Sequence, residues 1–197
     1  MKKCTSCNQR PLSRYCPALE ANICSFCCGT KRLKEINCIP DCEYLKKGEE
    51  YRKIRQINKE ISDTFQPKAD DIFINSEDAV NFAMRLESFF ISNFYDDMSI
   101  NDNDIYKALS KIYLYQTNNN ESLNPGNKCE ELIFEAFKDF DEDLSEINIE
   151  IKAKTILRIL RSIKTVSGGA LGNRNYLELI HSQFTGTGKW SELLNDE

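Results

Sequence analysis

Residues 4–42 read CTSCNQRPLSRYCPALEANICSFCCGTKRLKEINCIPDC, a stretch dense in cysteine. It contains eight of the nine cysteines of the chain, namely Cys4, Cys7, Cys16, Cys24, Cys27, Cys28, Cys38 and Cys42. Its large apolar side chains are few, and segments below ~40 residues rarely fold without disulfides, metals or oligomerisation. Metal is the simplest candidate, because a structural zinc site contributes roughly 10–16 kcal/mol of apparent binding free energy to folding.

The spacing of these cysteines supports a metal-binding module. Cys-x-x-Cys pairs begin at Cys4 and at Cys24, and each places two thiolates on one tight turn within reach of a tetrahedral ion at ~2.3 Å. A third close pair begins at Cys38, with three intervening residues, and Cys16 and Cys28 complete the set. Eight thiolates suffice for two closed Cys4 sites, so we expect two structural zinc ions.

Two parts of this stretch resemble known zinc modules. Tyr15-Cys16-Pro17 and the run from Cys24 to Cys28 are similar to the cross-braced zinc fingers of the MYND and HIT type, whose ligand pairs alternate between two ions. A closer resemblance is to bacterial proteins for which no activity is established. That resemblance rests on Cys16-Pro17-Ala18-Leu19, the run from Cys24 to Gly29, and Asp41-Cys42-Glu43-Tyr44-Leu45.

The resemblance implies a division of the ligands between two sites. One site would take Cys4, Cys7 and Cys24, and the other would take Cys16, Cys38 and Cys42, with Cys27 and Cys28 divided between them. The MYND and HIT spacing would assign Cys28 to the first site. The chain departs from that pattern, because it lacks a cysteine two or three residues after Cys16 and the usual histidine. The assignment of Cys27 and Cys28 therefore stays open.

An iron–sulfur cluster is the alternative to zinc. It also uses four cysteine thiolates, and the crowding around Cys24, Cys27 and Cys28 is compatible with one, although the closely repeated spacing of bacterial ferredoxins is absent. Disulfides are disfavoured for a chain expected in the reducing cytoplasm. That location is the expectation because the amino terminus lacks the apolar stretch of a signal peptide and no segment approaches the ~20 apolar residues of a membrane span.

The remainder of the chain has the pattern of an all-helical domain. The 197 residues are 41% hydrophobic and 29% charged, as in globular proteins. Apolar residues recur at helical spacing from residue 41 to 65, where Gln66-Pro67 ends the helix. Five further helices are predicted: one capped by Ser76, one beginning at Asn101 or Asp102, and others covering 132–140, 149–163 and 173–184. We expect a metal module at 1–43, which is cross-braced or treble-clef-like, a connecting helix at 44–66 and an α-helical bundle at 67–197.

Other motifs are weak signals of a site. Acidic residues from Asp139 to Glu150 follow the spacing of a calcium loop, but Leu144 stands where that loop needs glycine. Residues 186–189, Gly-Thr-Gly-Lys, lack the earlier glycine and the strand of a phosphate loop. His181, the single histidine, and Cys129 are interpreted as packing residues, and Trp190 as an anchor of the carboxy-terminal segment.

Charge is distributed unevenly and bears on function. Lys and Arg exceed Asp and Glu by six in residues 1–60, whereas acids exceed bases by eleven in the remainder. A basic face is predicted from Lys31, Arg32, Lys34, Lys46, Lys47, Arg52 and Arg55. Each zinc tetrathiolate carries about −2, so two sites would reduce the local charge from six to roughly +2.

The sequence favours a non-enzymatic zinc-finger adaptor. The module, or a groove between it and the helices, is expected to bind a protein or nucleic acid while the metal holds its shape. The alternative is a redox or iron-responsive regulator with an iron–sulfur cluster. No catalytic constellation is visible, so we do not expect an enzyme.

Overall fold

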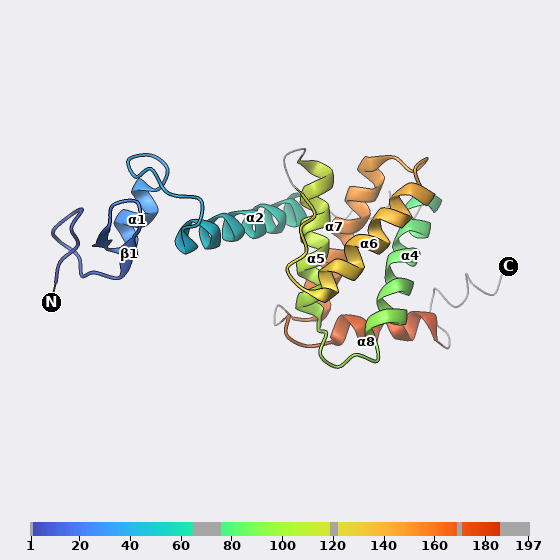
Figure 1. Ribbon diagram of the computed structural model, residues 1–197. Helices are drawn as coiled ribbons and strands as arrows, with labels where there is room; N and C mark the ends of the chain where they lie inside the picture. Colours follow the sequence, from blue (N-terminus) through green and yellow to red (C-terminus); the bar gives the residue numbers. More distant parts are fainter. Residues whose placement is uncertain (1, 65–75, 119–121, 169–170, 186–197) are drawn as a thin grey trace. The chain divides into compact units, whose positions relative to one another are not determined.

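The computed structural model describes residues 2–64, 76–118, 122–168 and 171–185 (Figure 1). Contacts between Cα atoms divide the chain into two compact units, Met1–Gln56 (unit 1) and Ile57–Glu197 (unit 2). The division falls inside helix α2 (Glu43–Thr64), which was predicted as a connecting helix. None of the described helices combines the length and the apolar character that crossing a membrane requires.

Unit 1 is built from a small hairpin followed by a short helix. Strands β1 (Arg14–Cys16) and β2 (Ala21–Ile23) pair antiparallel, with Tyr15 opposite Asn22. Successive residues of a strand face opposite sides, so Cys16 and Ile23 are buried whereas Tyr15 and Asn22 are exposed. Helix α1 (Ser25–Lys31) follows directly and buries Cys27 and Cys28.

Cysteines make up most of the buried core of unit 1. Five of them, together with Ile23 and Ile36, form one buried cluster, and the partly buried Leu12 and Tyr44 pack against it. Ile23 and Ile36 are the buried aliphatic side chains of that cluster. The sequence expectation that this stretch lacks a conventional hydrophobic interior agrees with this packing.

In its described residues, the regular secondary structure of unit 2 is all helical, as the sequence predicts. Helix α4 begins after Ser76, whose side chain caps the backbone N–H of Ala79, and α5 begins after Asn101, which forms a capping box with Asp104. The helices are α4 (Glu77–Phe94), α5 (Asp102–Thr117), α6 (Lys128–Asp143), α7 (Ile149–Val166) and α8 (Asn175–Phe184).

The core of unit 2 lies among these five helices and the end of α2. Both α4 and α5 contact α6, α7 and α8, and Ile57 and Ile61 of α2 belong to the same apolar cluster. Aromatic rings pack edge to face within it, as where the Phe82 and Phe137 centroids lie 6.5 Å apart. The faces that the sequence predicted to be apolar are largely buried, except that Ile149, the first residue of α7, is 59% exposed.

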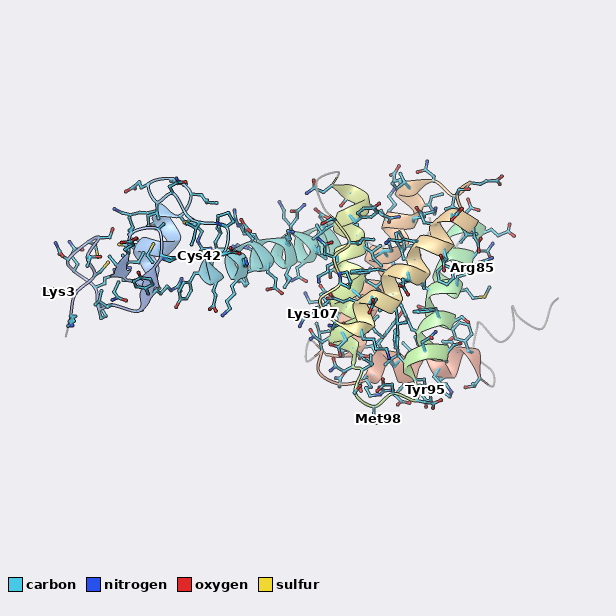
Figure 2. All side chains as sticks on the ribbon, viewed as in Figure 1. Lys3, Cys42, Arg85, Tyr95, Met98 and Lys107 are labelled. Atoms are coloured by element: carbon cyan, nitrogen blue, oxygen red, sulfur yellow. The ribbon has the colours of Figure 1, made fainter. Side chains whose placement is uncertain are left out.

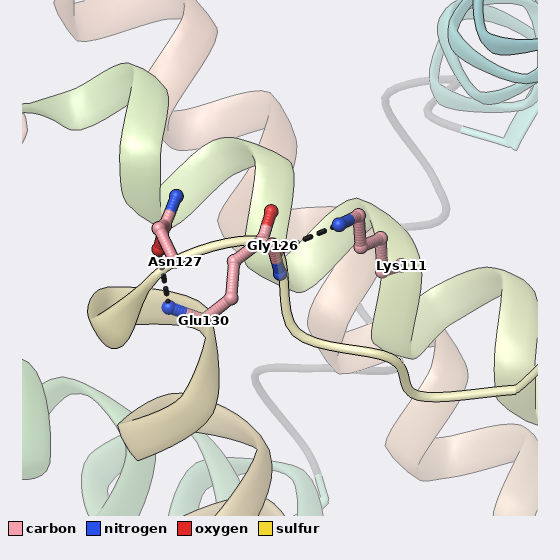
Figure 3. A network of polar contacts seen from close by, with 4 residues as sticks. All are labelled: Lys111, Gly126, Asn127 and Glu130. Atoms are coloured by element: carbon pink, nitrogen blue, oxygen red, sulfur yellow. Dashed lines mark hydrogen bonds and ion pairs between the residues drawn. The ribbon is translucent and has the colours of Figure 1, made fainter. Parts of the chain in front are cut away.

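A buried carboxylate fixes the start of α6 against α5. Glu130 accepts hydrogen bonds at 2.6 Å from both Lys111 Nζ and the backbone N–H of Gly126, while its own N–H donates to Asn127 Oδ1 at 2.8 Å (Figure 3). Asn127 is the N-cap of α6. This network satisfies helix-terminal N–H groups that would otherwise lack partners.

Some residues singled out in the sequence are placed in other roles, or lie outside the described part. Asp139, Asp141 and Asp143 belong to α6 rather than to a loop, and Asp141 Oδ1 receives a hydrogen bond of 2.7 Å from the buried Lys152. The ring of His181 stacks on that of Tyr95, with centroids 3.8 Å apart. The motif at 186–189 and Trp190 lie outside the described residues.

Candidate metal centre

Four cysteine sulfurs gather at one point in unit 1. The Sγ atoms of Cys4, Cys7, Cys24 and Cys27 all lie within 4.8 Å of one another, and those of Cys7 and Cys24 are 4.0 Å apart. Three of the four residues are buried, and Cys7 is partly so. Sulfurs bound at ~2.3 Å to one tetrahedral ion would be about 3.8 Å apart, so this cluster can hold a metal ion with little contraction.

Two local turns bring these four sulfurs together. The first holds Cys4 and Cys7: the Cys4 N–H donates to the Arg10 carbonyl and the Asn8 N–H to the Cys4 carbonyl, both at 2.8 Å. Asn8 has a φ of 52°, a conformation that asparagine tolerates better than most residues. The second is the start of α1, where Cys24 is the N-cap and its sulfur accepts from the Cys27 N–H at 3.3 Å.

Helix geometry separates the adjacent thiols Cys27 and Cys28. Consecutive helical residues point about 100° apart around the axis, so the two side chains face different directions. Cys27 joins Cys4, Cys7 and Cys24. This differs from the assignment that the MYND and HIT spacing implied, which would place Cys28 in the first site.

The surroundings of the first cluster shift the pKa values of Cys4 and Cys27 in opposite directions. Burial acts to raise the pKa of Cys4, but hydrogen bonds from the backbone N–H groups of Cys24, Cys7 and Ser6 outweigh it and lower the value to about 6. Burial, with the neighbouring sulfurs of Cys24 and Cys7, raises the pKa of Cys27 to about 12. The metal-free cluster therefore carries a thiolate at Cys4 and a retained proton at Cys27 at neutral pH.

The other four cysteines of unit 1 line one small cavity. Cys16, Cys28, Cys38 and Cys42 all contribute to its wall, and of these Figure 2 labels Cys42. The cavity volume of about 10 Å³ is close to that of a single water-sized sphere. Cys16 and Cys28 are buried, whereas Cys38 and Cys42 are partly exposed. Among the described residues, the potential metal-ligating group whose atoms all lie within 4.8 Å of one another is Cys4, Cys7, Cys24 and Cys27.

The predicted basic face is largely engaged in local interactions. Lys31 pairs with Glu35 at 3.0 Å, and Lys46 with Asp41 at 2.9 Å. Longer contacts of 3.7 and 3.9 Å join Lys47 to Glu43 and Arg52 to Glu49. Arg32 Nη2 lies 3.8 Å from Cys28 Sγ. Lys34 and Arg55 are exposed. The charge of this surface is therefore partly neutralised by neighbouring acids.

Two further arginines of the basic amino-terminal third lie over aromatic rings. The Arg10 guanidinium carbon is 3.8 Å from the Phe26 ring centroid, and that of Arg14 is 4.7 Å from the Tyr44 centroid. The spacing of Arg10 and Phe26 in the sequence gives no sign of this contact, because it depends on how the first turn packs against α1.

Cys129 lies apart from these groups, in unit 2. It is buried in α6, and burial followed by the nearby carboxylates of Asp104 and Glu130 raises its pKa to about 12. A thiol in such surroundings stays protonated, so the side chain packs as a small apolar group.

Comparisons of the chain with family models, with curated proteins and with solved structures find no significant match.

Proposed function

We propose that this protein is a non-enzymatic adaptor whose amino-terminal module is held in shape by two zinc ions and binds a protein partner. The observation that carries the proposal is the convergence of four sulfurs within 4.8 Å in a unit with few buried aliphatic side chains. Such a unit needs a cross-link, and a metal bound by four thiolates is one that a chain with free cysteines can form.

Zinc suits the first centre better than an iron–sulfur cluster. Four sulfurs within 4.8 Å of one another enclose a space for one ion, whereas a cluster interposes several iron and sulfide atoms between its cysteines. Tetrahedral coordination by four thiolates is the usual structural zinc site. Because four protein ligands leave no position for water, the ion would serve structure and not catalysis.

A second ion would occupy the cavity lined by the remaining four cysteines. The two sets alternate along the chain. Cys4 and Cys7 belong to the first set and Cys16 to the second; Cys24 and Cys27 belong again to the first set, and Cys28, Cys38 and Cys42 to the second. This alternation is the cross-braced order that the MYND and HIT resemblance implies.

A protein partner is favoured over nucleic acid by the surface of unit 1. Five large apolar side chains are 43–55% exposed within the first 39 residues, and they are Tyr15, Leu19, Phe26, Leu33 and Ile39. So many exposed apolar groups on so small a unit are typical of an interaction surface. Paired lysines and two tetrathiolate charges of about −2 each reduce the positive field that phosphate backbones require.

Metal content tests the first half of the proposal. Protein purified without oxygen should contain two zinc ions per chain and no visible chromophore, and substitution of Cys24 by serine should lower the zinc content. The matched control is Cys129→Ser, which should leave it unchanged. Iron with a brown chromophore would instead support the iron–sulfur regulator.

Partner capture tests the second half. The zinc-loaded chain should capture a protein from extracts of the native host, and treatment of the extract with nuclease should leave that capture intact. Phe26→Ser and Leu33→Ser should weaken the capture while the variants retain zinc. Met98→Ser is the control, because Met98 is 78% exposed but belongs to unit 2. If nuclease abolishes the capture, a nucleic-acid ligand is favoured. If neither Phe26→Ser nor Leu33→Ser weakens the capture, the proposal that these apolar side chains bind the partner is refuted.

A further inference from the structure

We propose that Arg32 is a positioning residue of the second thiolate set, its guanidinium binding the Cys28 sulfur in a space left free by the missing side chain of Gly48. The inference rests on the two-ion part of the proposed function. It gives Arg32 a role in the metal centre instead of the partner-binding face predicted from the sequence.

The contact of Arg32 with the thiolate set has two supports. Arg32 Nη2 lies within hydrogen-bond range of Cys28 Sγ, at 3.8 Å, from one helical turn further along the chain. Arg32 also lines the small cavity formed by Cys16, Cys28, Cys38 and Cys42. The guanidinium therefore lies beside the cavity that the second ion would enter.

Gly48 on α2 leaves the room that this guanidinium occupies. A Cβ at position 48 would lie 2.9 Å from Arg32 Cζ and would collide with Nη1. Glycine inside a helix is unfavourable relative to alanine, so its presence at Gly48 calls for a compensating contact. The close approach of Arg32 supplies that contact.

The positive charge of Arg32 would offset part of the negative charge of the second metal site. A divalent ion with four thiolates carries a net charge of about −2, and a guanidinium close to one sulfur offsets part of it. In the first set, backbone groups donate to sulfur instead: the Cys24 N–H lies 3.1 Å from Cys4 Sγ. Groups that hydrogen-bond to metal ligands typically affect metal affinity by about 10–100-fold when removed.

The test measures protection of each cysteine from alkylation in the zinc-loaded full chain as a chelator is added, with peptide mass spectrometry to separate the two sets. We expect Arg32→Ala to lower the chelator concentration that exposes Cys28, Cys38 and Cys42 about tenfold. Protection of Cys4 and Cys24 should not change. Arg32→Lys keeps the charge but loses the forked pair of donors, so it should retain part of the protection that Arg32→Ala loses.

Gly48→Ala is a second, independent variant. It should displace the guanidinium and weaken the second set in the same direction as Arg32→Ala, even though alanine favours the helix. Combining the two substitutions should add little to either alone, because both remove one contact. Lys34→Ala is the matched control: it removes a charge from an exposed position in the same loop and should behave like the unaltered chain.

Two other results would overturn the assignment. If Arg32→Ala leaves the second set as protected as before, or exposes both sets equally, Arg32 has no specific role at Cys28. If the unaltered chain retains one zinc ion and its second set is alkylated without chelator, the two-ion proposal itself fails. Zinc counted in the unaltered chain distinguishes that failure from a failure of Arg32 alone.

Discussion

Removal of metal should unfold unit 1 and leave unit 2 folded. The physical reason is the difference in their cores: Ile23 and Ile36 are the buried aliphatic residues in the cysteine cluster of unit 1, whereas unit 2 buries aromatic and aliphatic side chains from five helices and the end of α2. Burying one such side chain contributes about 1.5–3 kcal/mol, so these two together with the buried Leu45 of α2 still fall short of the roughly 10–16 kcal/mol that a structural zinc site supplies.

The structure sets the size of the spectroscopic change. Helix α1 and the part of α2 in unit 1 together hold about one fifth of the described helical residues, so metal-linked unfolding of unit 1 should remove no more than about that share of the helical circular dichroism. The remaining signal should unfold later, in a separate cooperative transition on heating or in urea.

The assay combines chelator titration with hydrogen exchange. Backbone amides of Cys4, Cys24 and Cys27, which take part in the turns of the metal cluster, should lose protection once zinc is removed, and re-adding zinc should restore it. Amides of α5 and α7 should keep theirs. The reasoning is refuted if verified zinc removal leaves unit 1 protected, or if the helical signal of unit 2 is lost in the same step.

Three further predictions follow from single residues. Because the pKa of Cys27 is raised to about 12, zinc must displace its proton, and zinc affinity should fall at least about tenfold per pH unit as pH is lowered through neutrality. Asp102→Ala should destabilise unit 2 by about 3–5 kcal/mol, since the buried carboxylate accepts from Ser167 Oγ at 2.6 Å and from the backbone N–H of Tyr176 at 2.9 Å. Burial and the Glu87 carboxylate raise the pKa of Tyr176 well above its usual value, so its share of stability is complete below pH ~10 and is lost above it at about 1.4 kcal/mol per unit.

Each of these has its own measurement and control. Calorimetry of zinc binding in buffers of different ionisation enthalpy counts the protons released, and a count of zero at neutral pH would contradict the state inferred for Cys27. Urea unfolding of Asp102→Ala is compared with Asp139→Ala, an exposed α6 position that should change stability by less than ~0.5 kcal/mol. Tyr176→Phe should flatten the alkaline loss of stability, and an unchanged pH profile would rule out that tyrosine as its source.

The sequence by itself determined the helices and pointed to a cysteine cluster that could hold a metal ion. Caps at Ser76 and Asn101 and apolar spacing along α4, α5 and α7 are local signals, which is why these elements begin where the pattern predicts. Likewise, paired cysteines in a stretch with little apolar content indicate metal without any knowledge of tertiary contacts.

Tertiary structure alone decided which thiols meet and what the charged residues contact. Cys27 and Cys28 are neighbours in sequence, and only the start of α1 at Ser25 fixes which of them faces Cys4. Arg32 belongs by composition to a basic surface, yet the approach of α2 at Gly48 places it against a sulfur. Both outcomes depend on side-chain direction and on contacts between segments far apart in the chain, and residue spacing does not encode either.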